Sequence, residues 1–207
     1  MTDPGPRDPE EASAESADRI DRLLHYRVFW LLGLIILGLD QVTKIWIQHT
    51  LPEGTYGPDG WIPVLPGLLY WVHVHNTGAA WGLFADGALF LAGLAVIVLA
   101  LLFRFRRALD LGHRYNQVVF GLIVGGILGN LVDRVLYGHV VDFIDVHLPL
   151  INYRWPAFNI ADSGICVGVL LYALAAFFPR QILGAPAVGS RTSPAGDQSN
   201  GGQDQTQ

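Results

Sequence analysis

Four long apolar segments constrain the fold of this chain more than any other feature of its sequence. They cover residues 28–47, 87–103, 118–135 and 160–178. A helix needs about 20 apolar residues to cross the hydrocarbon core of a membrane, and each segment reaches or nearly reaches that length. Hydrophobic residues make up 51% of the chain and charged residues only 15%, a balance typical of membrane proteins. We therefore expect an all-α membrane protein with four transmembrane helices.

The two ends of the chain contain too few apolar residues to fold. Residues 1–24 are acidic and rich in Pro, Ala, Ser and Glu, and residues 184–207 are rich in Gly, Pro, Ser and Gln. We expect both to be disordered tails around a membrane domain at residues 25–183. The net charge of −5 comes mostly from the first tail, so it does not indicate a nucleic-acid partner. No cleavable secretory signal is recognisable near Met1, so the first apolar segment should be retained.

The distribution of Lys and Arg predicts the orientation of the segments. Arginines precede the first segment, join the second to the third and follow the fourth, whereas residues 48–87 contain no Lys or Arg and residues 136–159 contain only Arg154. Because these residues concentrate on the cytoplasmic side of membrane proteins, both termini should be cytoplasmic and the two basic-poor connections extracytoplasmic. In the first connection, alternating residues between turn signals predict a small extracytoplasmic β-platform at about residues 50–80.

Polar side chains gather toward the extracytoplasmic ends of the apolar segments. Asp40 and Lys44 lie one helical turn apart in the first segment, and Asn130, Asp133 and Arg134 share one face of the third. An ion pair within a helix, or charges that end a span at the interface, would explain them structurally. Polar groups at membrane depth nevertheless need partners, so they also indicate a functional site.

Two further carboxylates belong to different parts of the sequence. Asp142 lies in the second outer connection with Asp145, and Asp162 opens the fourth segment. A structural explanation exists for each: Asn159 and Asp162 fit a helix cap, and Asp142 and Asp145 fit a solvated turn. A carboxylate near lipid is costly unless it is paired, hydrated or protonated, so two that converge would indicate a site. The residues alone leave both interpretations open.

Histidines on the outer side raise the question of a metal site. They include His73, His75, His139 and His147. Their spacing matches no metal-binding motif, and Cys166 is the only cysteine, so no Cys pair can form. We therefore expect neither a metal nor a cofactor.

Five motifs occur together in a fixed order. They are Asp40 with Lys44, Asn76-Thr-Gly-Ala-Ala80, Gly129-Asn-Leu-Val-Asp-Arg134, Val140-Val-Asp-Phe-Ile144 and Phe158-Asn-Ile-Ala-Asp162. In this combination the chain resembles the lipoprotein signal peptidase family, the signal peptidase II type of bacterial membrane aspartic protease. The resemblance covers about residues 28–178. One departure is Trp81, where many members are expected to have Phe, an aromatic exchange that should leave activity undisturbed.

The resemblance implies roles for individual residues. Asp142 and Asp162 would be the catalytic dyad of an aspartic endopeptidase. Substrate binding or stabilisation of the site would fall to eight others, namely Asp40, Lys44, Asn76, Gly78, Asn130, Asp133, Arg134 and Asn159.

The resemblance also implies a substrate and a location. The substrate would be a prolipoprotein whose cysteine already carries diacylglycerol, cut just before that cysteine, with membrane lipid as the other partner. The enzyme would lie in the bacterial inner membrane with its active site near the extracytoplasmic face, and we expect a monomer.

Two other classes of function compete with a protease. A proton-coupled carrier could relay protons through carboxylates, but it needs polar groups along a path across the membrane. Here they crowd one face, and the second segment has none. A non-enzymatic scaffold has no need of so many buried polar groups, so both are disfavoured.

Overall fold

The computed structural model describes residues 25–57, 60–79 and 83–177. The two predicted disordered tails and Trp81 lie outside the described residues. So does the last residue of the fourth predicted segment.

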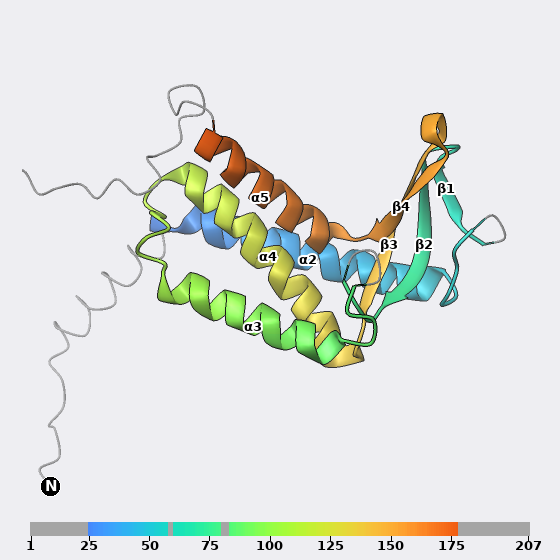
Figure 1. Ribbon diagram of the computed structural model, residues 1–207, viewed down its shortest axis with the longest axis horizontal. Coiled ribbons are helices and arrows are strands. Elements are labelled where there is room, and N and C mark those ends of the chain that lie inside the picture. The colour runs from blue at the N-terminus through green and yellow to red at the C-terminus, as the bar shows by residue number, and fades with distance from the viewer. Residues whose placement is uncertain (1–24, 58–59, 80–82, 178–207) are drawn as a thin grey trace, which may run out of the picture.

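Within the described residues, four helices form a bundle: α2 (Arg27–Thr50), α3 (Ala88–Arg104), α4 (Arg114–Tyr137) and α5 (Ile160–Phe177). Each contains nearly all of one predicted apolar segment. Figure 1 places α4 between α3 and α5, and α4 also packs along α2. Judged by length and composition over the described residues, α2, α4 and α5 can cross a membrane, whereas α3 is apolar but has only 17 residues. That α3 is a fourth span stays a prediction.

Glycines bring α4 unusually close to two of its neighbours. A Cβ on Gly125 would lie 2.6 Å from the carbonyl oxygen of Gly33 in α2, and a Cβ on Gly126 would collide with the carbonyl oxygen of Ala161 in α5. Small residues permit this backbone contact, which drives helix association in lipid through packing and polar contacts. The three helices α2, α4 and α5 therefore form one tightly packed unit.

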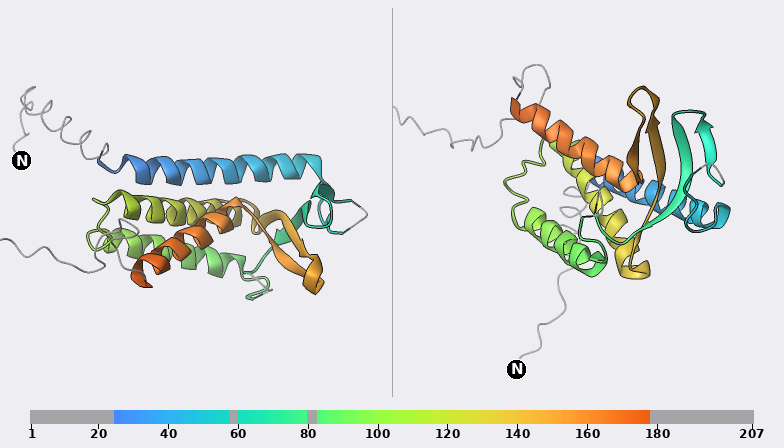
Figure 2. Two further views of the ribbon diagram at one scale, coloured as in Figure 1. Left: turned by 90° about the horizontal axis from the view of Figure 1, so that it is seen from above. Right: turned by 45° about the vertical axis from the view of Figure 1, so that its right-hand side comes forward.

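The described residues also form a four-stranded antiparallel sheet at one end of the bundle (Figures 1 and 2). Its strands are β1 (Ile62–Leu65), β2 (Leu69–Asn76), β3 (Val140–Leu148) and β4 (Tyr153–Phe158), in that order across the sheet, with the 3-10 turn η2 (Pro149–Ile151) between β3 and β4. The predicted platform at about residues 50–80 accounts only for β1 and β2. The other half comes from the second outer connection, so the predicted combination of apolar helices with a small sheet is present, but the sheet has more strands than the predicted platform.

The sheet is anchored on the end of α2 by a small apolar core. Ile47 and Leu51 pack there against Val141 and Phe143 of β3. Side chains alternate along a strand, so the packing of Val141 and Phe143 turns the intervening Asp142 to the other face. This register sets the direction of one of the two carboxylates singled out by the sequence.

Candidate active site

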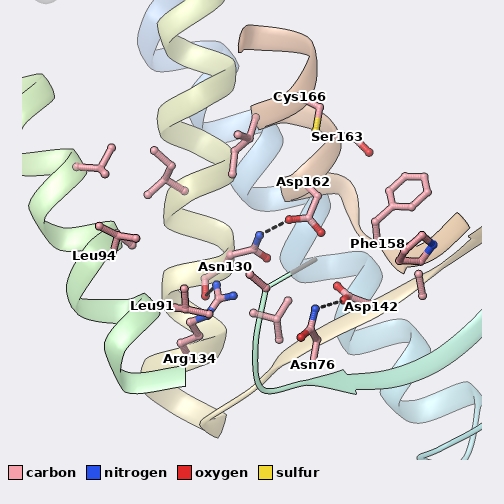
Figure 3. A pocket seen from close by; sticks show the side chains of 18 of the residues that line it. Asn76, Leu91, Leu94, Asn130, Arg134, Asp142, Phe158, Asp162, Ser163 and Cys166 are labelled. Atoms are coloured by element: carbon pink, nitrogen blue, oxygen red, sulfur yellow. Dashed lines mark hydrogen bonds between the residues drawn. The ribbon is translucent and has the colours of Figure 1, made fainter. Parts of the chain in front are cut away.

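Asp142 and Asp162 line the same cavity, which has a volume of about 700 Å³. Asp142 comes from β3 and Asp162 from the first turn of α5, and both point into the space between the sheet and the bundle (Figure 3). Apolar residues of α3 and α5 line much of the rest of the cavity, together with residues of α4 and β4. The predicted convergence of the two carboxylates is therefore confirmed.

Asn159 holds both carboxylates. The side-chain oxygen of Asn159 accepts a hydrogen bond from the backbone N–H of Asp162 (2.9 Å), and the backbone N–H of Asn159 donates to Asp162 Oδ2 (3.3 Å). These two bonds form a reciprocal cap of α5. The amide nitrogen of Asn159 donates at the same time to Asp142 Oδ1 (2.7 Å). The predicted cap is therefore confirmed, and it belongs to the site instead of competing with it.

Two further amides orient the pair. Asn76 Nδ2 donates to Asp142 Oδ2 (2.9 Å), and Asn130 Nδ2 donates to Asp162 Oδ1 (2.7 Å). Every carboxylate oxygen of the pair thus accepts at least one N–H. Such bonds fix the side chains in one orientation without supplying a full positive charge.

The buried ammonium group of Lys44 contacts Asn130 on the side away from Asp162. Lys44 Nζ pairs with Asp40 Oδ2 (2.7 Å) and with Asp133 Oδ2 (2.8 Å), and it donates to Asn130 Oδ1 (3.1 Å). Because Lys44 can only donate, this contact identifies the amide oxygen of Asn130 and turns its nitrogen toward Asp162. The predicted pair of Asp40 with Lys44 is confirmed, whereas Asp133 pairs with Lys44 instead of with its neighbour Arg134.

Backbone contacts join this network to the rest of the site. Asp40 Oδ1 accepts the N–H of Ala161 in α5 (2.9 Å), and Asp133 Oδ2 accepts the N–H of Val141 in β3 (3.2 Å). A Cβ on Gly129 would lie 2.6 Å from Asp40, so only glycine leaves room for that carboxylate. The network therefore positions both elements that carry Asp142 and Asp162.

Arg134 connects α4 to the turn after β2. Its Nη2 donates to the carbonyl oxygen of Gly78 (3.0 Å), and the N–H of Gly78 donates in turn to Asn76 Oδ1 (3.0 Å). A Cβ on Gly78 would lie 2.6 Å from the carbonyl oxygen of Leu83, so the turn can close only with glycine here. Among the described residues, the buried Nε of Arg134 has no acceptor. All eight supporting residues expected from the resemblance thus reach the two carboxylates directly or through one another.

Burial raises the pKa of Asp142 to about 7, and the nearby carboxylate of Asp162 adds to this effect. The amides of Asn76 and Asn159 and the charge of Lys44 act in the opposite direction. Two carboxylates this close cannot both ionise cheaply, so they titrate as a pair. Near neutral pH the pair can therefore hold one proton.

Some polar contacts of this region were missed from the sequence. Gln41 Nε2 donates to Asp133 Oδ1 (2.9 Å), and the only signal for it is an amide next to Asp40 in an apolar segment. Asp145 is fully buried in β3 and paired with Arg154, so its interpretation as a solvated turn residue is wrong. No group of three His, Cys, Asp or Glu side chains within the described ranges is arranged to hold a metal ion.

A buried carboxylate pair held by amides, at one end of an apolar helical bundle, defines the class of membrane aspartic proteases. The sequence profile described as signal peptidase (SPase) II matches residues 32–178. This chain belongs to the signal peptidase II family, as the five motifs predicted.

Named relatives and solved structures agree with this assignment. A lipoprotein signal peptidase of Xanthomonas oryzae pv. oryzae (strain PXO99A) is 35% identical over 157 residues, which cover 74% of this chain and 90% of that protein. One from Oleidesulfovibrio alaskensis is 38% identical over 156 residues, 72% of this chain and 94% of that protein. A bacterial membrane enzyme solved by the in meso method at 2.3 Å resolution has a TM-score of 0.63 at 37% identity, covering 70% of this chain and 85% of that one.

Proposed function

We propose that this protein is a membrane aspartic endopeptidase that removes the signal peptide from diacylglyceryl-modified prolipoproteins, cutting just before the modified cysteine. The observation that carries the proposal is the cavity shared by Asp142 and Asp162, which is polar beside the sheet and apolar between α3 and α5. A peptide bond and its attached lipid thus find suitable surroundings in one cavity.

The catalytic step needs only the two carboxylates and water. The ionised member of the pair takes a proton from the attacking water, while the protonated member donates a hydrogen bond to the scissile carbonyl oxygen. Water adds to the carbonyl carbon, and the tetrahedral intermediate collapses as a proton passes to the leaving amine. The raised pKa of Asp142 supports this division of roles, because it keeps one proton on the pair near neutral pH.

The surrounding residues prepare the pair for this step. Asn76, Asn130 and Asn159 hold the carboxylates in place, and the Lys44 network with Asp40 and Asp133 holds Asn130. Arg134 lines the cavity, so we assign its guanidinium the role of donating a hydrogen bond to a carbonyl oxygen of the substrate backbone. Its contact with Gly78 then ties substrate binding to the turn after β2.

The lipid of the substrate would occupy the apolar end of the cavity. Leu91, Leu94 and Val98 of α3 face Ile165 and Val167 of α5 there. Acyl chains gain little affinity by leaving equally apolar lipid, so this end acts mainly by positioning the scissile bond at Asp142 and Asp162.

Charges at the other end of the bundle support one orientation in the inner membrane. Arg27, Arg104 and Arg114 lie at the ends of helices away from the sheet (Figure 1). Basic residues favour the cytoplasmic side, which supports cytoplasmic termini and an active site at the extracytoplasmic face. We also propose that the protein works as a monomer, since both carboxylates come from one chain.

The test is a cleavage assay in detergent with one precursor peptide in lipidated and unlipidated form. We expect the lipidated form to be cut before its cysteine and the unlipidated form to be cut far more slowly even at saturating concentration. Equal turnover of the two forms would leave a general membrane aspartic protease as the better description. Cleavage at another bond would remove the lipoprotein assignment.

A further inference from the structure

A groove lined by β2 leads away from the two carboxylates. A hollow of about 260 Å³ adjoins Asp142 and Asn76 and continues along Val74 and His75. A second hollow of about 490 Å³ shares Val74, His75 and Ala157 with the first and extends to the segment after α2. We name the whole the β2 groove, and its lining includes Glu53, Tyr56, Val74, His75, Asn76 and Ala157.

The direction of this groove identifies what would occupy it. Its near end opens at Asp142, whereas Glu53 follows the end of α2 beside the sheet, away from the apolar end of the cavity. In a membrane-bound precursor, the chain before the cut lies in the bilayer and the chain after the modified cysteine leads out into water. The β2 groove therefore suits the first residues after the cysteine. This assignment of the occupant rests on the proposed function.

The far end of the groove carries a charged and a titratable side chain. Glu53 is well exposed, with 70% of its side chain accessible, and its Oε1 lies 2.7 Å from His75 Nδ1. His75 Nε2 lies 3.2 Å from His73 Nε2, and the ring of His75 stacks on that of His139 with centroids 3.7 Å apart. The groups that face His75 are thus two histidines and one carboxylate.

The hydrogen bonds of this cluster determine its charge. His73 Nδ1 lies 2.8 Å from the carbonyl oxygen of Leu51, which can only accept, so this nitrogen carries a proton. In neutral His73 the other ring nitrogen, Nε2, can only accept, so His75 Nε2 must carry a proton and donate it to His73. A neutral His75 then has no proton left on Nδ1, so only a charged His75 can donate a hydrogen bond to Glu53. Burial and the neighbouring His139 lower the pKa of His75, so near neutral pH the carboxylate of Glu53 loses this donor.

We propose that Glu53 and His75 form a specificity subsite that favours a Lys or Arg side chain in the first residues after the modified cysteine. The exposed carboxylate supplies the negative charge, and a cation from the substrate replaces the missing donor. When His75 is protonated at lower pH, it neutralises Glu53 and the preference for a cation weakens.

The test compares lipidated precursors that differ only in carrying Lys or Glu at the second or third position after the cysteine. At pH 7.5 we expect kcat/KM to favour Lys about threefold to fivefold, the range of a solvent-exposed ion pair. The ratio should fall toward one at pH 5.5. Because both substrates use the same Asp142 and Asp162, titration of that pair cancels from the ratio.

Variants of this chain separate the subsite from other charges. Glu53→Gln should bring the Lys to Glu ratio close to one, and Glu53→Lys should invert it. The matched control is Asp110→Asn, which removes an exposed carboxylate that lies beside His113 at the other end of the bundle and should leave both rates unchanged.

Three results would overturn the proposal. The first is a ratio of one in the parent protein at both positions, with the lipidated precursors still cut normally, which leaves the proposed function intact. The second is a parent ratio that persists in Glu53→Gln and Glu53→Lys. The third is no cleavage of any lipidated precursor, which removes the proposed function and this subsite together.

Discussion

The two sides of α4 differ sharply in how they pack. Toward α2 and α5, glycines bring backbones into contact, and the polar side chains between them are buried and bonded to one another. Toward α3 the packing is sparse: only Ala88 and Ala92 of α3 are buried, and two of its leucines, Leu91 and Leu94, line the cavity. Rigid packing thus coincides with the residues that hold the carboxylates, and loose packing with the surface proposed for the lipid.

The largest expected effect belongs to the two carboxylates on the rigid side. Asp142→Asn and Asp162→Asn should each lower kcat by at least about a thousandfold, because each removes an acid–base group from the shared-proton step. Thermal melting in detergent should show that both variants still fold, since Asn keeps the shape of the side chain although its Nδ2 replaces one accepting oxygen. Activity within about tenfold of the parent, or about 1.4 kcal/mol in barrier, would exclude that residue from catalysis.

A pair of glycine substitutions probes the packing difference itself. Gly126→Ala forces a methyl group against the backbone of Ala161 and should destabilise the protein by about 1–3 kcal/mol. Gly93→Ala in α3 is the matched control, because no described atom lies within 4 Å of its added Cβ. Melting temperatures in detergent measure both. Equal losses in the two variants would mean that the loss in Gly126→Ala does not come from the contact with Ala161.

Occupying the loose side should affect the substrate more than the fold. Leu94→Trp fills part of the cavity and should lower kcat/KM for lipidated precursor about tenfold by displacing the scissile bond. Leu89→Trp serves as control, since Leu89 is 82% exposed and does not line the cavity. If Leu94→Trp is as active as Leu89→Trp, the lipid does not enter between α3 and α5.

The smallest expected effect is a shift in the pH profile. Because the pKa of Asp142 is about 7, kcat/KM should decline above neutral pH as the pair loses its last proton. Asn76→Ala removes a donor that favours the ionised form, so this decline should move to higher pH by up to about one unit. A shift to lower pH would contradict the role given to the amide.

The same raised pKa makes a prediction about stability. Asp142 binds its proton more tightly in the folded protein than in the unfolded chain. Its contribution to the free energy of unfolding is therefore present below pH 4 and is lost as pH rises toward 7. In Asp142→Asn this part of the pH dependence of melting should be missing. An unchanged dependence would place the raised pKa elsewhere.

The sequence predicted the helices better than the sheet. Apolar length marks the helices, because a helix satisfies its backbone within one segment. Strand β3 gives no such signal: its residues Val140, Val141 and Phe143 are buried on both faces, and Asp142 and Asp145 are buried among them, so apolar and polar residues do not alternate. A strand of this kind is recognisable only once its partners β2 and β4 are known.

The site shows the same division between local and distant contacts. The ion pair of Asp40 with Lys44 and the cap formed by Asn159 and Asp162 span three or four residues, so spacing alone revealed them. The contact of Asn159 with Asp142, and that of Gln41 with Asp133, depend on how separate elements pack. The resemblance to a family therefore predicted which residues support the site, but it did not predict the individual hydrogen bonds that they make.

The cap of α5 has a consequence for the order in which the protein is made. Asn159 bonds Asp142 only where the first turn of α5 is wound, and Ala161 of that turn bonds Asp40 in α2. As α5 is the last described helix, a chain that has inserted α2, α3 and α4 still lacks Asp162 and one of the amides that orient Asp142. With Asp142 and Asp162 as the proposed catalytic pair, proteolytic competence would arise only once α5 is in place, and a chain without α5 would not cleave its membrane neighbours by this mechanism.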